Sequence, residues 1–289
     1  MSAAPPRVAF LGPAGTNTDE ALRASATGPI EAVAVATVRE AVLAVQRREA
    51  DRAVVPIENS LEGGVAATLD ALAAEAPDVR IERETVHPIH HHLIAAAPVA
   101  LDALQRVRSH PHALGQCSRF LRERTPAAEL AAASSTAEAV RAVVADGDGG
   151  DEAAIGSPLA AELYGGVVLA ERIEDRPDNV TRFVWLAHAE DAPPPPQGPA
   201  KTSIVFWGFN DDAPGSLVSV LRELSDRAIN LTKIESRPRR VRLGHYMFFA
   251  DLDASTAEPR VAEALAALGR RVETVRVLGC YPPAPSSPP

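Results

Sequence analysis

Short runs of β-branched residues alternate along the chain with Ala- and Leu-rich stretches of helical spacing. A strand at residues 7–11, a polar turn at 12–18 and a helix at about 19–25 begin this pattern. Further strands are expected at 31–35, 52–57, 106–110 and 153–155, and further helices at 38–48, after 64, at 113–124 and at 137–146. This order predicts an α/β fold, in which ligand-binding turns lie at the carboxyl ends of strands. The three most unusual loops follow residues 11, 57 and 107, all at such ends.

A Pro-rich segment at residues 190–200 separates this region from a second pattern. It contains four consecutive prolines, which favour an extended, semi-rigid spacer and place a domain boundary there. The following strands are expected at 202–209, 230–236, 245–253 and 272–281, and the helices at 215–227 and 259–268. This βαββαβ order predicts a ferredoxin-like α+β domain over residues 201–281. The tail at 282–289 has no apolar periodicity and is expected to be disordered.

Composition narrows the class of protein. The 289 residues are 46% hydrophobic, enough for about two packed domains. A formal net charge of -9 argues against binding to nucleic acid or to an anionic membrane surface. Cys117 and Cys280 lie far apart and offer neither a disulfide framework nor a CxxC metal site. Together with the absence of a signal-like or membrane-spanning stretch, this predicts a cytoplasmic protein with reduced thiols.

The turn at residues 12–18, GPAGTNT, allows two interpretations. Its two glycines permit positive φ, and Thr16 and Thr18 add hydroxyls at a helix start, as in an anion-binding cradle. A tight turn with a good helix N-cap explains the same residues. The turn lacks the Lys of a Walker P-loop and the third glycine of a dinucleotide fingerprint, so nucleotide binding is poorly supported.

Three further segments carry polar groups: two follow expected strands directly, and the third, residues 178–183, leads into a strand expected at 183–186. Residues 56–64 combine a carboxylate, an amide and a hydroxyl before two glycines, although Asn59 or Ser60 capping a helix accounts for part of this. Residues 109–117 likewise place polar groups in a turn and in the first turns of a helix, and a helix-capping role for Ser109 is the alternative to a role in a binding site. In residues 178–183 a hydroxyl stands beside a guanidinium, which suits an anionic substrate, while an exposed salt bridge is the ordinary role for Arg182.

Taken together, the four segments resemble the motifs of the prephenate dehydratases: a GPxGT turn, a VPIENSxEG loop, an SHPxxxxQC segment and an NxTRF segment. Asn17 stands where the family usually has Phe, and His112 where it commonly has Gln. The resemblance implies a two-lobed, periplasmic-binding-protein-like unit at residues 7–189 with the active site between the lobes. Lobe one would comprise residues 7–83 and 171–189, and lobe two residues 84–170.

The resemblance also implies a reaction, the decarboxylating elimination of water from prephenate to give phenylpyruvate. The implied catalytic residues are Thr181, Glu58, Ser109 and Gln116, and the implied substrate-binding residues are Thr16, Asn59, Ser60, Arg182 and Phe183. Thr181 would donate to the leaving hydroxyl; a Thr hydroxyl is too weak an acid to release its proton outright, so we expect an oriented hydrogen bond. Glu58 is either a rival acid or a permanent carboxylate that orients Asn59 or Arg182.

The substrate dianion would be met by Arg182, by the backbone amides of residues 12–16, and by Ser109 with Gln116. No cofactor is implied. Three consecutive histidines, His90 to His92, invite a metal interpretation, but in an alternating strand they point to opposite faces and lack a Cys or HExxH partner, so no metal site is expected.

The C-terminal pattern resembles the ACT domain of the same family, with a GALV-like element that has Ser216 for Ala, and an ESRP element. The implied phenylalanine-binding residues are Gly215, Ser216, Leu217, Val218, Asn230, Leu231, Glu235 and Ser236. The resemblance implies feedback inhibition by L-phenylalanine in a homodimer or homotetramer. Three alternatives stay open at this point: an ACT domain that only dimerises, an arogenate dehydratase, and a non-catalytic binding protein on the same fold.

Overall fold

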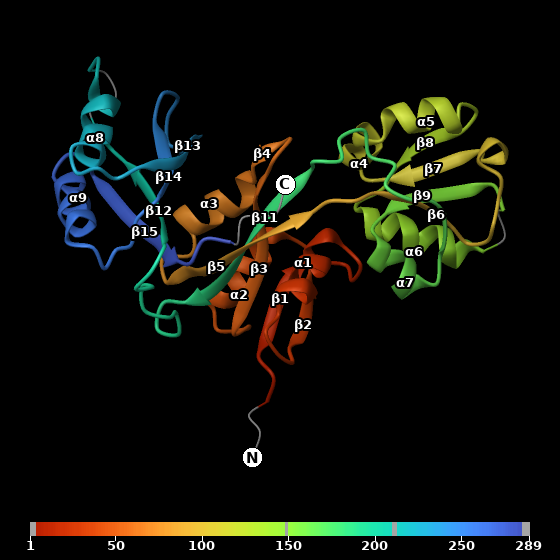
Figure 1. The fold of residues 1–289 in the computed structure, drawn as a ribbon, viewed down its shortest axis with the longest axis horizontal. Helices are drawn as coiled ribbons and strands as arrows, with labels where there is room; N and C mark the ends of the chain where they lie inside the picture. Colours follow the sequence, from red (N-terminus) through yellow and green to blue (C-terminus); the bar gives the residue numbers. More distant parts are fainter. Residues whose placement is uncertain (1–3, 148–149, 210–212, 285–289) are drawn as a thin grey trace.

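Three units lie in a row along the long axis of the molecule (Figure 1). The computed structural model describes residues 4–147, 150–209 and 213–284. Lobe one is central, lobe two lies on one side of it and the C-terminal domain on the other. No helix in these residues is both long and apolar enough to cross a lipid bilayer.

Lobe one is built on a mixed sheet with strand order β5-β11-β3-β1-β2. Its strands are β1 (Arg7–Leu11), β2 (Glu31–Val35), β3 (Arg52–Asn59), β4 (Gly63–Gly64), β5 (Val79–Pro88) and β11 (Val180–His188), and its helices are α1 (Asn17–Ser25), α2 (Val38–Gln46) and α3 (Ala66–Ala74). β1 runs parallel to β2 and β3, whereas β11 runs antiparallel to β3 and β5. The short β4 pairs with the end of β3 and closes the loop that holds the polar residues 58–62.

Lobe two has a five-stranded sheet of order β10-β6-β9-β7-β8. Its elements are β6 (His92–Ala95), η1 (Leu101–Ala103), β7 (Arg106–Ser109), α4 (Pro111–Gln116), α5 (Ser118–Arg124), β8 (Glu129–Ala132), α6 (Thr136–Asp146), β9 (Glu152–Gly156), α7 (Pro158–Tyr164) and β10 (Val167–Ala170). The chain crosses between the lobes twice, at residues 89–91 and 171–179. Two crossings therefore join the two α/β lobes that the resemblance implied.

Two boundaries differ from the sequence-based prediction. β5 continues to Pro88, where it pairs with Val180, so lobe one extends past the expected limit at residue 83. The helix expected at 113–124 is two helices, because Cys117 has φ -114° and ψ 16°, which ends α4 before α5 begins. Strands β4, β5, β6, β8 and β10 and helix α7 were not predicted; all of these strands except β5 are only two to four residues long.

The C-terminal domain has the predicted βαββαβ order, with β12 (Lys201–Trp207), α8 (Ser216–Ser225), β13 (Leu231–Pro238), β14 (Tyr246–Leu252), α9 (Pro259–Gly269) and β15 (Thr274–Tyr281). Its sheet order is β13-β14-β12-β15, and β13 is the edge strand. The helices cover one face, over a core that includes Phe206, Leu224, Leu252 and Leu268.

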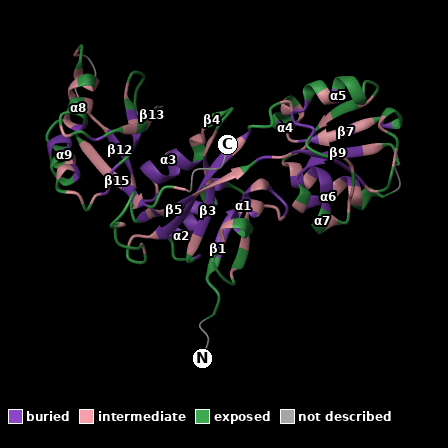
Figure 2. Ribbon diagram, viewed as in Figure 1, coloured by how far each residue is buried: buried purple, intermediate pink, exposed green. Residues whose placement is uncertain are grey.

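The other face of this domain packs directly on lobe one. Phe249 and Leu278 belong to the same hydrophobic cluster as Leu69 and Leu72 of α3, and Figure 2 shows the buried positions running from α3 toward the C-terminal sheet. β15 also pairs in parallel with β5 through Gly279, where the Ile81 carbonyl occupies the space that a β-carbon would need. A shared apolar core fixes the two units against each other far more firmly than a Pro-rich spacer can.

The tail was expected to be disordered from residue 282. Instead, the Ala284 amide donates to Glu84 Oε1 at 2.9 Å, so residues 282–284 lie against lobe one. The remaining tail residues, 285–289, lie outside the described part of the chain.

Candidate active site

A cavity of about 580 Å³ lies between lobe one and lobe two. It brings together Thr16, Asn59, Gln116 and Thr181 of the predicted site residues. The other polar residues of its lining are Asn17, Thr18, Glu62, His91, His110, His112, Ser134, Ser135, Thr136 and Asn179. Both lobes therefore contribute side chains to one cavity, as the order of the motifs along the chain implied.

The orientation of the Asn59 amide is fixed by the backbone of the loop that follows it. The amide nitrogens of Leu61 and Glu62 donate to Asn59 Oδ1 at 2.9 and 3.0 Å. Asn59 Nδ2 must then face the other way, where it donates to Asn179 Oδ1 at 2.8 Å and to Thr181 Oγ1 at 2.9 Å. Since backbone N–H groups can only donate, this assignment follows from the geometry and not from a choice of flip.

The Thr181 hydroxyl is consequently available as a donor toward the cavity. Its oxygen accepts from Asn59, and none of its hydrogen bonds within residues 4–147, 150–209 and 213–284 uses its own hydrogen. Thr181 is 7% exposed and lines the cavity. A hydroxyl held in this way presents its hydrogen to whatever oxygen occupies the cavity.

Two backbone amides of the turn at residues 12–16 are already paired within the protein. The Gly12 amide donates to Val35 O at 2.9 Å, and the Gly15 amide donates to Asp19 Oδ2 at 2.9 Å. Thr16 caps α1 by accepting from the Asp19 amide at 3.3 Å, and its hydroxyl donates to Leu11 O at 2.9 Å. The alternative interpretation, a tight turn with an N-cap, describes the structure, and Thr16 reaches the cavity only as part of its wall.

This turn also holds the two lobes together. The Ser157 hydroxyl at the start of α7 donates to Gly15 O at 2.8 Å, and the Tyr164 hydroxyl donates to Ala14 O at 2.7 Å. Gly15 has φ 83°, and a β-carbon there would lie 3.0 Å from the Ala160 Cα. Glycine at this position therefore allows the close approach of lobe two, which is a structural reason for the motif.

Glu58 and Arg182 lie outside the cavity, although both were predicted as site residues. Asn59 pairs with Thr181 across β3 and β11, and Glu58 pairs with Arg182 one position further. Because neighbouring residues of a strand point to opposite faces, the first pair faces the cavity and the second faces the C-terminal domain. The predicted role of Arg182 as a donor to the substrate conflicts with this position.

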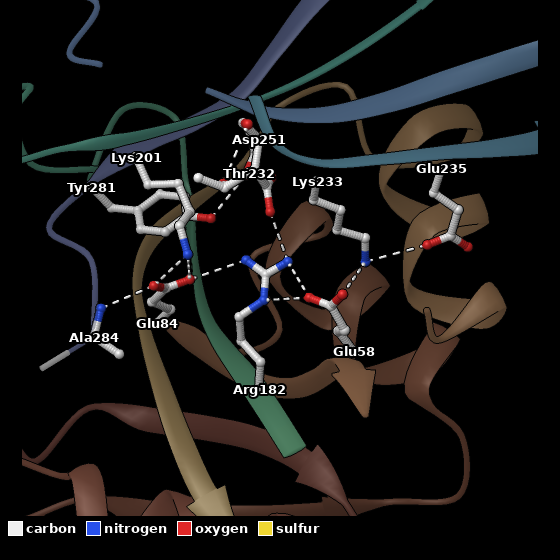
Figure 3. A network of polar contacts seen from close by, with 11 residues as sticks. Glu58, Glu84, Arg182, Lys201, Thr232, Lys233, Glu235, Asp251, Tyr281 and Ala284 are labelled. Atoms are coloured by element: carbon white, nitrogen blue, oxygen red, sulfur yellow. Dashed lines mark hydrogen bonds and ion pairs between the residues drawn. The ribbon is translucent and has the colours of Figure 1, made fainter. Parts of the chain in front are cut away.

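The Arg182 guanidinium is instead the centre of an ionic network between lobe one and the C-terminal domain (Figure 3). It donates to Glu58 at 3.0 Å, to Glu84 at 3.0 Å and to Asp251 of β14 at 2.7 Å. Burial opposes the charge of this group, but the attraction of Asp251, Glu84 and Glu58 outweighs it and raises the pKa of Arg182 above its usual value.

The network continues around these carboxylates. Lys201 binds Glu84 at 2.7 Å, and Lys233 of β13 lies 3.5 Å from Glu58 and 3.2 Å from Glu235 (Figure 3). Glu58 thus lies between Arg182 and Lys233, in contact with the guanidinium that it was predicted to orient.

Three other predicted site residues do not line the cavity. Ser109 is fully buried, and its hydroxyl donates to Ile155 O at 2.7 Å inside lobe two. Ser60 accepts from the Val180 amide at 3.0 Å and so ties the β3–β4 loop to β11. Phe183 is 2% exposed in the core under α1.

The predicted effector residues lie on α8 and β13. Gly215 is the N-cap of α8 with φ 83°, Ser216 begins the helix and Val218 is 59% exposed. Along β13, residues 232, 234 and 236 are exposed and residues 233, 235 and 237 are half-buried. The remaining predicted residues of this element are Asn230, Leu231, Glu235 and Ser236, of which Asn230 and Ser236 are exposed.

The half-buried face of β13 contacts lobe one at three successive alternate positions. Lys233 meets Glu58, the Glu235 carboxylate fills the space that a β-carbon at Gly64 would take, and Arg237 binds Asp70 of α3 at 2.9 and 3.2 Å. The element predicted to bind an effector therefore touches the loop and helix that follow Asn59.

Sequence reasoning missed several residues of the cavity. Asn179 is part of the NxTRF motif, but the sequence indicates no role for it, and it indicates Thr18 only as a hydroxyl at a helix start. Ser134, Ser135 and Thr136 form the start of α6, where Ser135 is the N-cap. A run of small hydroxyl residues before a helical pattern is the signal that could have indicated them.

The fold and the cavity define a two-lobed α/β enzyme with an attached α+β domain. The family model for prephenate dehydratase matches residues 8–191, and that for the ACT domain matches residues 209–270. A prephenate dehydratase of Amycolatopsis methanolica is 42% identical over 275 residues, covering 95% of this chain and 88% of that protein. The chain belongs to the prephenate dehydratase family and carries an ACT domain.

Two solved structures are similar over nearly the whole chain. Prephenate dehydratase from Arthrobacter aurescens in complex with L-Phe has a TM-score of 0.87 at 41% identity, covering 96% of this chain and 90% of that one. GqqA, described as a novel type of quorum quenching acylase, has a TM-score of 0.85 at 30% identity, covering 96% and 98%.

Proposed function

We propose that the cavity converts prephenate into phenylpyruvate, with Thr181 as the hydrogen-bond donor to the departing hydroxyl. The ring carboxylate leaves as carbon dioxide, its bonding electrons complete the aromatic ring, and the C–O bond to the ring hydroxyl breaks. The hydroxide released takes up one proton from the solvent to become water. Family membership supports the reaction, and the orientation of the Thr181 hydroxyl by Asn59 is the observation that supports its role.

Thr181 acts in this proposal without giving its proton away. A Thr hydroxyl is far too weak an acid to transfer its proton near neutral pH, but a short hydrogen bond stabilises negative charge that develops on the leaving oxygen. Asn59 has both of its oxygen lone pairs directed at backbone amides, so it holds the Thr181 hydroxyl without competing for its hydrogen. This is preorganisation of a donor, which accounts for much of the catalysis in many enzymes.

The substrate dianion is met by neutral donors in this proposal. Within residues 4–147, 150–209 and 213–284, no Lys or Arg side chain lines the cavity. The lining offers the Gln116 amide and hydroxyls of both lobes, and the first turn of α6 adds backbone N–H groups beside Ser134 and Ser135. Neutral donors also leave the departing carboxylate poorly solvated, which favours its loss as carbon dioxide.

L-phenylalanine regulates the reaction through the ACT domain in this proposal. The related enzyme from Arthrobacter aurescens was solved with L-Phe. Here β13 contacts Glu58 and Gly64, which flank the loop that holds Asn59, so a shift of β13 on effector binding displaces that loop. The effect on Thr181 follows, because Asn59 orients its hydroxyl.

We further propose a homodimer or homotetramer in the cytoplasm. Among the described residues β13 pairs with β14 on one side only, and exposed apolar side chains gather on the same domain, at Val218, Ile234, Leu243 and Tyr246. Such a surface favours pairing with a second copy. Cys117 and Cys280 are unpaired thiols in different domains, which fits a reducing compartment.

A single assay tests these proposals together. Phenylpyruvate formation from prephenate and, in parallel, L-phenylalanine formation from arogenate are followed, while L-phenylalanine is titrated into the prephenate reaction. We expect turnover of prephenate and its inhibition by L-phenylalanine. Turnover of arogenate but not of prephenate would show that arogenate is the substrate. If L-phenylalanine changed neither the activity nor the sedimentation, the ACT domain would be a dimerisation module only.

A further inference from the structure

His91 occupies the first crossing between the lobes and lies against the cavity. It is 3% exposed, and its Nε2 lies 2.9 Å from Gln116 Oε1. Its backbone joins both crossings, because the Ile173 amide donates to His91 O at 2.8 Å and the His91 amide donates to Glu174 Oε2 at 3.0 Å. His91 is not among the motif residues, and the sequence pattern assigns it no role.

The chain of side-chain amides in the cavity fixes which nitrogen of His91 carries the hydrogen. Asn59 Nδ2 donates to Asn179 Oδ1, so Asn179 must present its Nδ2, and this group donates to Gln116 Oε1 at 3.2 Å. Gln116 Oε1 is therefore an acceptor, and the His91 nitrogen facing it must be a donor. The backbone amides of residues 61 and 62, at the other end of this series of hydrogen bonds, determine the direction of donation along all of it.

Three hydrogen bonds hold Gln116, two at its side-chain amide oxygen and one at its backbone. Its oxygen accepts from His91 and Asn179, and its backbone oxygen accepts from the Asp175 amide at 2.7 Å. The two hydrogens on its Nε2 must then point away from both donors, one toward Glu62 Oε1 at 3.4 Å and the other free for the cavity. Without the histidine donor, one of the two constraints on the orientation of the side-chain amide is lost.

We propose that His91 is a positioning residue for the reaction: as the Nε2–H tautomer it holds Gln116 so that the Gln116 NH₂ group faces the substrate. The inference deepens the proposed function and rests on it, because Gln116 is the residue through which His91 acts. The charged and titratable groups around His91 are Glu174, His90 and Glu20. Glu174 is bound to His90 Nδ1 at 2.9 Å as well as to the His91 backbone, so the imidazole is left to Gln116.

The test is a double-mutant cycle with a rescue variant. Wild type, His91→Leu, His91→Gln, Gln116→Ala and His91→Leu/Gln116→Ala are compared by kcat/KM for prephenate. We expect His91→Leu to lose about tenfold or more, as when a buried acceptor loses its donor. His91→Gln, whose amide nitrogen can reach the same position, should recover to within about threefold of wild type. In the Gln116→Ala background the His91→Leu change should cost less than about twofold.

The outcomes separate this inference from the proposed function. If wild type converts prephenate and Gln116→Ala converts it more slowly, the proposed dehydratase function is supported whatever the role of His91. An equal loss from His91→Leu in both backgrounds would show that His91 acts on the fold and not through Gln116, and would overturn the inference. An independent readout is the ¹⁵N spectrum of labelled histidine in the intact enzyme, in which a His91 signal of the Nδ1–H tautomer would also overturn it. Thermal unfolding of each variant confirms that folded protein is compared.

Discussion

Thr181 and Asn59 lie directly opposite each other on β11 and β3, and the Asn59 amide donates to the Thr181 hydroxyl at 2.9 Å. The neighbouring pair, Glu58 and Arg182, faces the C-terminal domain and closes an ionic network there. One strand pair therefore carries the proposed catalytic donor on one face and the contact with the ACT domain on the other. A single residue step along the chain separates the two functions.

The Asn59→Asp variant tests the orientation of the Thr181 hydroxyl. A carboxylate at position 59 still accepts from the Leu61 and Glu62 amides, so the loop is kept, but it cannot donate to Thr181. The Thr181 hydroxyl then donates to the introduced carboxylate and turns away from the cavity. We expect kcat to fall by about 100-fold or more, with KM changed less than about threefold.

Two variants of Thr181 serve as matched controls for this experiment. Thr181→Ser keeps the hydroxyl and should retain activity within about tenfold of wild type, whereas Thr181→Ala should be at least as impaired as Asn59→Asp. Steady-state kinetics with prephenate checks all three. A near-wild-type kcat in Asn59→Asp would show that the Asn59 amide is not needed to orient the Thr181 hydroxyl.

Arg182 is expected to matter for stability and not for substrate affinity. Arg182→Lys keeps a positive charge but cannot reach Glu58, Glu84 and Asp251 together, so the unfolding free energy in urea should fall by about 2–4 kcal/mol. Asp251→Asn weakens the same network from the C-terminal domain and should destabilise in the same direction. In both folded variants KM for prephenate should stay within about threefold of wild type. A KM raised about thirtyfold in Arg182→Lys alone would restore Arg182 as a substrate ligand.

The fold could be predicted from the sequence because hydrophobic periodicity reports local structure well. The βαββαβ order of the C-terminal domain and strands β1, β2, β3 and β11 of lobe one follow from it, whereas the ten-residue β5 was missed. Very short strands such as β8 and β10 do not follow from periodicity, since four residues give too little pattern to separate a strand from a loop. The packing of the C-terminal sheet on α3 could not be predicted either. The apolar residues of both elements could equally have packed within their own domains, and the sequence pattern does not distinguish the two arrangements.

The site could be predicted only as a set of segments. Motif resemblance places Thr181 and Arg182 in one group, and only the strand alternation, read together with the pairing to β3, separates them. His91 shows a different limit. Its partner Gln116 lies 25 positions away on another element, so nothing local in the sequence distinguishes it from its two histidine neighbours.

Lys233 is predicted to transmit inhibition without taking part in the reaction. It bridges Glu235 of the ACT domain and Glu58 of lobe one and does not line the cavity. Lys233→Met keeps the length of the side chain and removes the charge. Basal kcat should stay within about threefold, while the L-phenylalanine concentration for half-inhibition should rise about fivefold or more. An unchanged inhibition curve, with L-phenylalanine binding retained by calorimetry, would show that coupling runs through other contacts.

Stability should fall as the pH is lowered from about 7 toward about 5.5, and His91 and His92 should account for part of the slope. Burial lowers the pKa of both histidines below the ordinary value of 6.5, so the unfolded chain takes up protons at these groups at a higher pH than the folded protein does. Unfolding then binds protons over this range, and each proton contributes a slope of up to about 1.4 kcal/mol per pH unit. The stabilisation is fully present above about pH 7 and is lost as the pH falls through the lowered values.

Urea unfolding at several pH values measures the contribution of the two histidines. The dependence of the unfolding free energy on pH should have a smaller slope in His91→Gln/His92→Gln than in wild type, because neither glutamine takes up a proton when the chain unfolds. Glu174, whose pKa is lowered, loses its contribution only below its ordinary value of 4.5, so measurements above about pH 5.5 isolate the histidines. Parallel curves for the variant and wild type would contradict the assignment, since the slope would then come from other groups.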